Sequence, residues 1–136
     1  MTVKIGIIGG SGLDNPDMFT NARDTFTSTV WGEPSSPLRE GEIAGVPVAL
    51  LARHGRSHTL APSSVNYRAN VQALKDAGCT HILATTATGS LREEIRRGDL
   101  VIIDQFIDFT KQRKMTFHDY FKPGQPVHAA MSEPFD

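Results

Sequence analysis

Three short segments of this sequence combine glycine residues with side chains that can bind an anion. They read Gly9-Gly10-Ser11-Gly12, Arg53-His54-Gly55 and Thr86-Ala87-Thr88-Gly89. Glycine lets an anion approach backbone N–H groups closely, hydroxyl groups donate hydrogen bonds to its oxygens, and an arginine guanidinium can bind two oxygens at once. Together the three segments predict a binding site for a phosphate dianion.

Each segment also has an ordinary structural explanation. The glycines could form a tight turn that binds no ligand, Arg53 could form a salt bridge at the end of a strand, and His54 could be a hydrogen-bonded core histidine. The phosphate hypothesis depends on all three segments meeting, because polar groups that converge on one space distinguish a binding site from separate turns.

A predicted apolar strand precedes each of the three segments. These strands cover Val3 to Ile8, Val46 to Ala52 and Cys79 to Thr86, and they are rich in β-branched and aliphatic residues. In α/β sheets, ligands bind beyond the carboxyl ends of the strands. We therefore expect the three strands to lie side by side, so that their polar end segments share one edge of the sheet.

The sequence also predicts strands beyond these three. Leu38 to Ile43 and Val46 to Ala52 flank Ala44-Gly45, which predicts a hairpin with a two-residue turn. Thr25 to Val30 and Leu100 to Ile103 are predicted as further strands from their threonine and aliphatic residues. The strand from Val46 to Ala52 is apolar on both faces, so we expect it to be central in the sheet.

One helix is predicted, and it sets the expected fold class. Apolar residues recur every four positions from Val65 to Ala77, after Pro62-Ser63-Ser64 and before Gly78. We predict an α/β fold with a mixed, largely parallel central sheet and flanking helices. One helix of about 13 residues cannot cover both faces of such a sheet. We therefore expect residues 1–136 to form the incomplete N-terminal portion of a single domain, with the remainder absent from this chain.

The composition indicates which classes of partner to expect. The chain has 136 residues, 39% apolar and 21% charged, with a formal net charge of −1, so it carries no general attraction for nucleic acid or anionic membranes. Its single cysteine, Cys79, allows no internal disulfide, and no apolar run approaches the length of a membrane span. We expect a cytoplasmic protein that binds neither nucleic acid nor membrane. The histidines lack metal-ligand spacing, so we expect no metal.

Five stretches of the sequence, in chain order, resemble the trimeric purine nucleoside phosphorylase family, and within it the 5′-methylthioadenosine phosphorylases. They read I-G-I-I-G-G-S-G-L, L-L-A-R-H-G-R, V-N-Y-R-A-N, T-T-A-T-G-S-L-R-E-E-I and V-I-I-D-Q-F-I-D. The resemblance covers nearly the whole chain but only the N-terminal half of such enzymes, which are about twice as long.

The resemblance implies phosphorolysis of a purine nucleoside. In this reaction inorganic phosphate attacks the anomeric carbon, so that 5′-methylthioadenosine gives adenine and 5-methylthioribose 1-phosphate. Phosphate is then the co-substrate, and no cofactor or metal is implied. By match with the family, the residues that bind phosphate are Ser11, Arg53, His54, Thr86 and Ala87. Serine at position 11 stands where many relatives have threonine, which keeps the hydroxyl group.

Three further roles follow from the same resemblance. Ala87 also lies near the ribose, His128 reaches into the site of a neighbouring subunit, and His58 lies close to the phosphate loop. No catalytic residue is assigned, because the acid that assists purine departure belongs to the half of the enzyme with no counterpart here. We therefore expect a homotrimer of completed domains, each needing a complementing C-terminal chain, and no activity from this chain alone.

Two alternative functions remain open at this point. The chain could be a non-catalytic fragment or assembly subunit that needs a second chain. It could instead be a Rossmann-type dinucleotide-binding oxidoreductase, whose fingerprint is G-x-G-x-x-G running into a helix. That alternative is disfavoured because Asn15 stands where the third glycine is required and Pro16 interrupts the helix.

Overall fold

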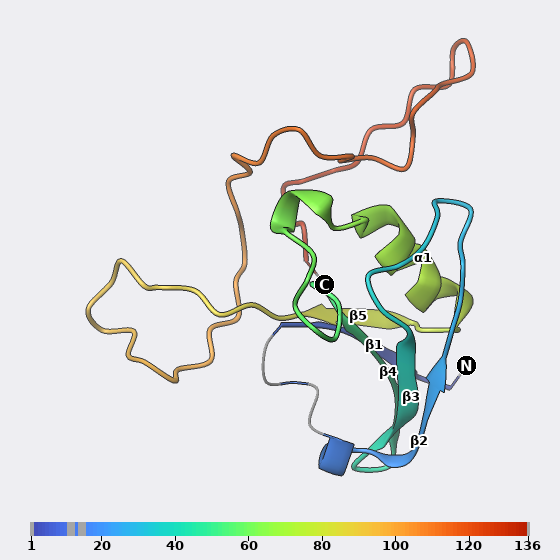
Figure 1. Ribbon diagram of the computed structural model, residues 1–136. Coiled ribbons are helices and arrows are strands. Elements are labelled where there is room, and N and C mark those ends of the chain that lie inside the picture. Colours follow the sequence, from blue (N-terminus) through green and yellow to red (C-terminus); the bar gives the residue numbers. More distant parts are fainter. Residues whose placement is uncertain (1, 11–12, 14–15, 136) are drawn as a thin grey trace. The chain divides into compact units, whose positions relative to one another are not determined.

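The computed structural model describes residues 2–10, 13 and 16–135 (Figure 1). The chain divides into two compact units, Met1–Ala87 and Thr88–Asp136, here called the first and second unit. All the named helices and strands belong to the first unit.

The first unit is built on a five-stranded mixed sheet, with strand order β2-β3-β4-β1-β5 (Figure 1). Its strands are β1 (Ile5–Gly9), β2 (Thr20–Thr25), β3 (Leu38–Ile43), β4 (Val46–Ala52) and β5 (His81–Ala84). β1 pairs in parallel with both β4 and β5, whereas β3 pairs antiparallel with β2 and β4. The predicted mixed α/β sheet is confirmed, and its parallel strands are those that precede the three polar segments.

One α-helix is present among the described residues, and this helix, α1 (Tyr67–Asp76), packs on one face of the sheet (Figure 1). Its first turn is capped by Asn66, whose side-chain oxygen accepts a hydrogen bond from the Ala69 N–H at 3.2 Å. The chain leaves the helix through Gly78, which has a φ of +81° that suits glycine. The core joins the buried face of α1 to β3 and β4 through Leu38, Ala49, Leu51, Ala73 and Leu74.

Strand β1 lies very close to α1, and this explains why the second residue of β1 is a glycine. A Cβ atom at Gly6 would lie 3.0 Å from Leu74 Cδ1 and 3.3 Å from Cys79 Sγ. Cys79 itself packs against the core as a partly buried residue. The helix can approach the sheet this closely only because residue 6 has no side chain.

The predicted hairpin is confirmed. Its arms are β3 and β4, with bounds that match the prediction, and its turn residues Ala44 and Gly45 have φ values of +51° and +78°. Positive φ at both central residues is the conformation that matches the twist of the flanking strands. The sequence therefore determined the register of the sheet's middle strand.

Several predicted elements differ in their bounds: β1 covers Ile5–Gly9 where Val3 to Ile8 is predicted, and β5 covers His81–Ala84 where Cys79 to Thr86 is predicted. The strand predicted from Thr25 to Val30 is instead β2, which ends at Thr25, because Thr29 and Gly32 exchange backbone hydrogen bonds in a tight turn. Pro62–Ser64 forms a separate 3-10 helix (η2), since Val65 is extended and interrupts it before α1. A second 3-10 helix, η1 (Pro16–Met18), follows β1.

The second unit contains no helix or strand among its described residues, 88–135. The strand predicted from Leu100 to Ile103 is therefore wrong. These residues are exposed and have no strand beside them, and an apolar run forms a strand only when a neighbour pairs with its backbone. Hydrogen bonds still form within the second unit, where the Gln105 side chain donates to the carbonyls of Met131 and Ser132.

No helix in the part of the chain that the structure describes is long and apolar enough to cross a membrane.

Candidate functional site

Three parallel strands bring Gly9-Gly10, Arg53-His54-Gly55 and Thr86-Ala87 to one edge of the sheet. β1 lies between β4 and β5, with Gly9 opposite Ala52 and Ile8 opposite Ala84. The pairing continues one residue further on each side. The Arg53 N–H donates to the Gly9 carbonyl at 3.1 Å, and the Thr85 N–H donates to the Ile8 carbonyl at 3.0 Å. The structure therefore confirms the prediction that these strand ends lie side by side.

The Arg53 side chain links the end of β4 to the end of β5. Its Nη1 donates to the Thr85 carbonyl at 2.9 Å, and its Nη2 lies 3.5 Å from the Thr86 hydroxyl oxygen. A Cβ atom placed on Gly10 would lie 3.4 Å from the same Nη2. The guanidinium thus lies close to Gly10 and Thr86 of the other two segments, and the small residue at position 10 leaves space beside it.

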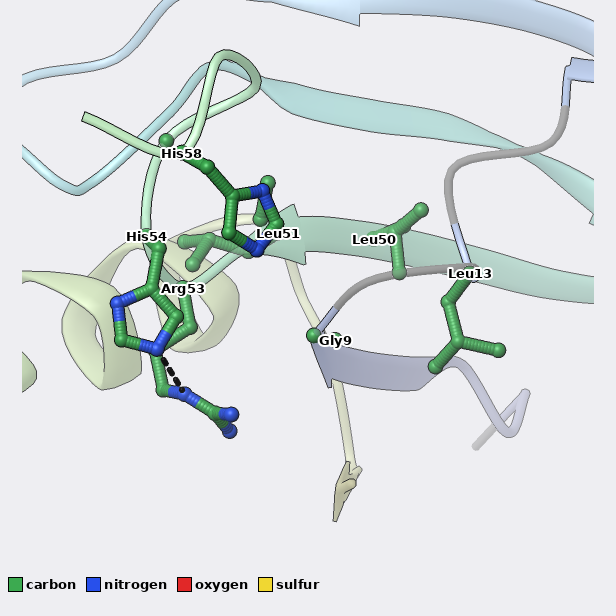
Figure 2. A pocket seen from close by; sticks show the side chains of 10 residues that line it. Gly9, Leu13, Leu50, Leu51, Arg53, His54 and His58 are labelled. Carbon is green, nitrogen blue, oxygen red and sulfur yellow. Dashed lines mark hydrogen bonds between the residues drawn. The ribbon is translucent and has the colours of Figure 1, made fainter. Parts of the chain in front are cut away.

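His54 is hydrogen-bonded through both ring nitrogens. Its Nδ1 lies 2.9 Å from the Leu60 carbonyl oxygen, and Arg53 Nε donates to its Nε2 at 3.3 Å (Figure 2). A carbonyl can only accept, so Nδ1 carries the proton and Nε2 offers its lone pair. These two hydrogen bonds assign the neutral Nδ1–H tautomer to His54.

The loop after β4 folds back on itself around His54. The His58 N–H donates to the Gly55 carbonyl at 3.1 Å, and the Leu60 N–H donates to the His54 carbonyl at 3.0 Å. Gly55 has a φ of +76°, which lies in the left-handed region that favours glycine. The His58 ring stacks on the His54 ring with centroids 5.7 Å apart (Figure 2). Both imidazoles therefore belong to one ordered loop.

A small pocket lies beside these residues (Figure 2). Its described lining comes from β1, β4 and the loop after β4: Gly9, Gly10, Leu13, Leu50, Leu51, Ala52, Arg53, His54, Gly55 and His58. The cavity volume is about 10 Å³, close to the space that one water molecule needs. A nucleoside is far larger, so this pocket by itself provides no nucleoside site.

The remaining predicted site residues have different outcomes. Ser11 lies outside the described residues. Thr86 and Ala87 follow β5 and are exposed at the end of the first unit. His128 is an exposed residue of the second unit. The first unit thus brings together Arg53, His54 and Thr86, with His58 on the adjoining loop.

An ion pair that the sequence analysis does not predict joins the loop after β4 to β2, an outer strand of the sheet. Both Nη atoms of Arg56 donate to the Asp24 carboxylate of β2, at 2.5 and 2.7 Å. Arg39 Nη1 lies 3.6 Å from the same carboxylate. The Arg56 hydrogen bond is the main reason that the pKa of Asp24 lies below its ordinary value. Thirty-two positions separate the two residues, so no local pattern could have paired them.

Among residues 2–10, 13 and 16–135, no group of three or more histidine, cysteine, aspartate or glutamate side chains could hold a metal ion.

Comparison with protein families matches residues 4–136 to the phosphorylase superfamily. The chain belongs to this superfamily. Two of its relatives are the S-methyl-5′-thioadenosine phosphorylases of Danio rerio, 55% identical over 139 residues, and Xenopus tropicalis, 57% identical over 136 residues. Each alignment covers 98% of this chain and 48% of the relative. The chain therefore spans about half the length of the curated relatives it matches.

Solved structures of the superfamily agree with the sequence comparison. A methylthioadenosine phosphorylase from Schistosoma mansoni in complex with tubercidin matches with a TM-score of 0.87 and 50% identity, over 98% of this chain and 49% of that chain. A variant of the adenosine/methylthioadenosine phosphorylase of the same species, in complex with adenine, gives the same TM-score and identity. The resemblance predicted from the five sequence stretches is confirmed.

Proposed function

We propose that this chain supplies most of the phosphate site of a methylthioadenosine phosphorylase. The reaction is the phosphorolysis of 5′-methylthioadenosine to adenine and 5-methylthioribose 1-phosphate. The observation that supports it is the Arg53 side chain, which spans the ends of β4 and β5 beside Gly10. This arrangement occurs in a chain at least 55% identical to two S-methyl-5′-thioadenosine phosphorylases.

The proposed chemistry needs a fixed phosphate more than it needs a strong nucleophile. A phosphate oxygen forms the new bond to the anomeric carbon while the bond from that carbon to the purine nitrogen breaks, and its electron pair leaves with the purine. The sugar carries positive charge in the transition state, so an adjacent phosphate dianion stabilises it. Holding the dianion in line with the breaking bond supplies the positioning.

The residues at the strand ends have distinct parts in this proposal. The Arg53 guanidinium provides the positive charge and a planar pair of donors. The hydroxyl groups of Ser11 and Thr86 and the backbone N–H of Ala87 provide neutral donors to the other oxygens. Ala87 also borders the ribose, and His58 lies at the edge of the site.

The nucleoside part of the site lies outside the residues that the first unit brings together. The purine and ribose would be held by a complementing C-terminal polypeptide, and His128 would come from a neighbouring subunit of a homotrimer. Complexes of the Schistosoma mansoni relatives with adenine and tubercidin support a purine nucleoside as the substrate. The proposed location is the cytoplasm.

The test is complementation. The 136-residue chain is assayed for adenine release from 5′-methylthioadenosine and phosphate, alone and after co-expression with the C-terminal half of the Danio rerio relative. We expect turnover only from the mixture, and loss of that turnover with Arg53→Ala. Turnover by the chain alone would contradict the need for a second chain. A stable complex without turnover would favour the non-catalytic alternative.

A further inference from the structure

We propose that Asp24, on the outer strand β2, is a positioning residue for the anion site at the end of β4. Its carboxylate holds Arg56, and Arg56 in turn fixes the loop that carries Arg53 and His54. Asp24 itself makes no contact with phosphate. The inference rests on the proposed function, because it names a residue outside the phosphate site on which the affinity for phosphate depends.

The loop after β4, residues 53–60, is closed by hydrogen bonds within itself. The Gly55 N–H donates to the Ala52 carbonyl at 3.0 Å, and the Leu60 N–H donates to the His54 carbonyl at 3.0 Å. These bonds give the loop its shape. They do not determine how the loop as a whole lies against the sheet, because they join the loop only to itself and to the end of its own strand.

The pair of Arg56 and Asp24 joins this loop to one face of the sheet. Asp24 lies opposite Arg39 of β3, and Arg39 lies opposite Leu50 of β4. Directly opposite residues share a face of a sheet, and successive residues of a strand alternate between faces. Leu51 packs in the core with α1, so its neighbour Leu50 belongs to the other face together with Asp24. Arg56 therefore holds the loop against the face opposite α1.

The Asp24 carboxylate interacts with two cations at once. Both Nη atoms of Arg56 donate to it, at 2.5 and 2.7 Å, and a bidentate pair of this kind fixes the orientation of the guanidinium. Arg39 Nη1 lies 3.6 Å from Asp24 Oδ1, the oxygen that also accepts from Arg56 Nη2. Without the negative charge of Asp24, Arg39 and Arg56 would repel each other, and the loop would move away from the sheet.

The exposure of the pair means that its main effect is on position rather than on stability. The side chains of Arg56 and Asp24 are 43% and 32% exposed, and ion pairs with this exposure contribute little to folding. Arg53 stands only three positions before Arg56 in the chain. A small movement of Arg56 therefore shifts Arg53, and a misplacement of about 1 Å is enough to weaken a precisely held ligand strongly.

Removal of the Asp24 charge separates positioning from a general effect of charge. Asp24→Asn makes the protein less negative, so the electrostatic field alone would raise its affinity for phosphate. Loss of positioning lowers that affinity instead. Binding of inorganic phosphate is measured by calorimetry at constant pH and ionic strength. We expect Asp24→Asn to bind phosphate about fivefold more weakly than the unsubstituted 136-residue chain.

Three further variants test whether the effect belongs to this ion pair. Glu42→Gln is the matched control, because Glu42 is exposed on the neighbouring strand β3 and the substitution removes the same charge. We expect it to leave phosphate affinity unchanged or slightly higher. Asp24→Glu keeps a carboxylate for Arg56, so we expect affinity within about twofold of the unsubstituted chain. Arg56→Gln combined with Asp24→Asn should lose no more than Arg56→Gln alone, because both changes remove one contact.

The enzyme reconstituted with a complementing C-terminal half gives a second readout. We expect Asp24→Asn to raise the KM for phosphate and to leave the KM for 5′-methylthioadenosine unchanged. A general loss of folded protein would lower the rate at every substrate concentration and change neither KM. Circular dichroism and thermal melting establish that each variant is folded.

The combined results distinguish failure of this inference from failure of the proposed function. No phosphate binding by the unsubstituted chain would refute the phosphate site itself, and this inference with it. Binding that is unchanged or stronger in Asp24→Asn would overturn the positioning role and leave the phosphate site intact. An equal loss of affinity in Glu42→Gln, or in Asp24→Glu, would also overturn it.

Discussion

Arg53 is the residue on which the candidate anion site depends, because it follows β4 and its side chain reaches residues that follow β1 and β5. Lysine at this position would keep the positive charge but lose the planar fork and the Nε donor to His54. We expect Arg53→Lys to weaken phosphate binding at least about tenfold, measured by calorimetry, since two charge-assisted hydrogen bonds are lost. Arg23→Lys is the matched control, because the Arg23 side chain is 76% exposed on β2. A similar loss in the control would show that the effect is not specific to the site.

The sequence predicts the types of these site residues but not their contacts. Glycine, arginine and threonine after apolar strands indicate an anion site, and this inference does not require knowing how their side chains are oriented. The hydrogen bond from Arg53 to the Thr85 carbonyl depends on how far a flexible side chain reaches across β1, and no local pattern carries that information. The same holds for Asp24 and Arg56, whose contact depends on the complete sheet.

At the scale of elements, the approach of α1 to β1 makes Gly6 a sensitive position. We expect Gly6→Ala to lower the free energy of unfolding by about 1–3 kcal/mol, because the added methyl group would lie 3.0 Å from Leu74 Cδ1 in a packed core. Urea denaturation measures this change. Gly89→Ala is the control, since a Cβ atom there would meet nothing within 4 Å. An unchanged midpoint for Gly6→Ala would show that the helix shifts freely.

A second element-scale feature is the ion pair that joins Lys4, the residue before β1, to Glu40 of β3. Lys4 Nζ donates to a Glu40 carboxylate oxygen at 2.6 Å and to the Ala77 carbonyl at 2.8 Å. The Thr25 hydroxyl donates to the other carboxylate oxygen at 2.6 Å. Hydrogen bonds from Lys4 first, and then from Thr25, hold the pKa of Glu40 below its ordinary value of 4.5. The ionised form is therefore favoured by folding.

The lowered pKa of Glu40 makes the stability of the fold depend on pH. Stability from Glu40 is fully present above pH 4.5 and is lost as the pH falls through the lower pKa of the folded state. We expect Glu40→Gln to cost about 1–2 kcal/mol in unfolding free energy at pH 7 and less at pH 3. Glu42→Gln, on the same strand but exposed, is the control. A cost for Glu40→Gln that is the same at both pH values would contradict the ion pair.

The elements differ in how well the sequence predicts them, and the difference has a physical cause. β3 and β4 follow from a local signal, the two-residue turn at Ala44-Gly45, which fixes their register without reference to the rest of the chain. β2 is displaced because the turn between Thr29 and Gly32 competes with strand pairing. Leu100 to Ile103 has the composition of a strand but no partner, and composition alone cannot supply one.

At the scale of the whole molecule, the two units differ in how much apolar surface they bury. The first unit contains the core, whereas Leu91, Ile102 and Tyr120 of the second unit are each more than nine-tenths exposed. Large apolar side chains that are exposed lose contact with water when a partner covers them. The second unit is therefore where a complementing chain would gain most from contact.

Limited proteolysis tests this difference between the units. We expect trypsin to cut first after Arg96 and Arg97, which are exposed in irregular backbone, and to spare Lys75 in α1. Mass spectrometry of the fragments identifies the sites. Early cleavage after Lys75, or after Arg39 in β3, would contradict the first unit as the stable part. Protection of Arg96 by the complementing chain would locate the contact.

The thiol of Cys79 allows opening of the folded state to be measured by chemical labelling. Desolvation raises the pKa of this thiol, and alkylating reagents attack only its ionised form. It is also the only sulfhydryl in the sequence. Iodoacetamide should therefore label the native chain slowly and the denatured chain quickly, so that the labelling rate measures how often the strand-helix contact opens, without any introduced probe.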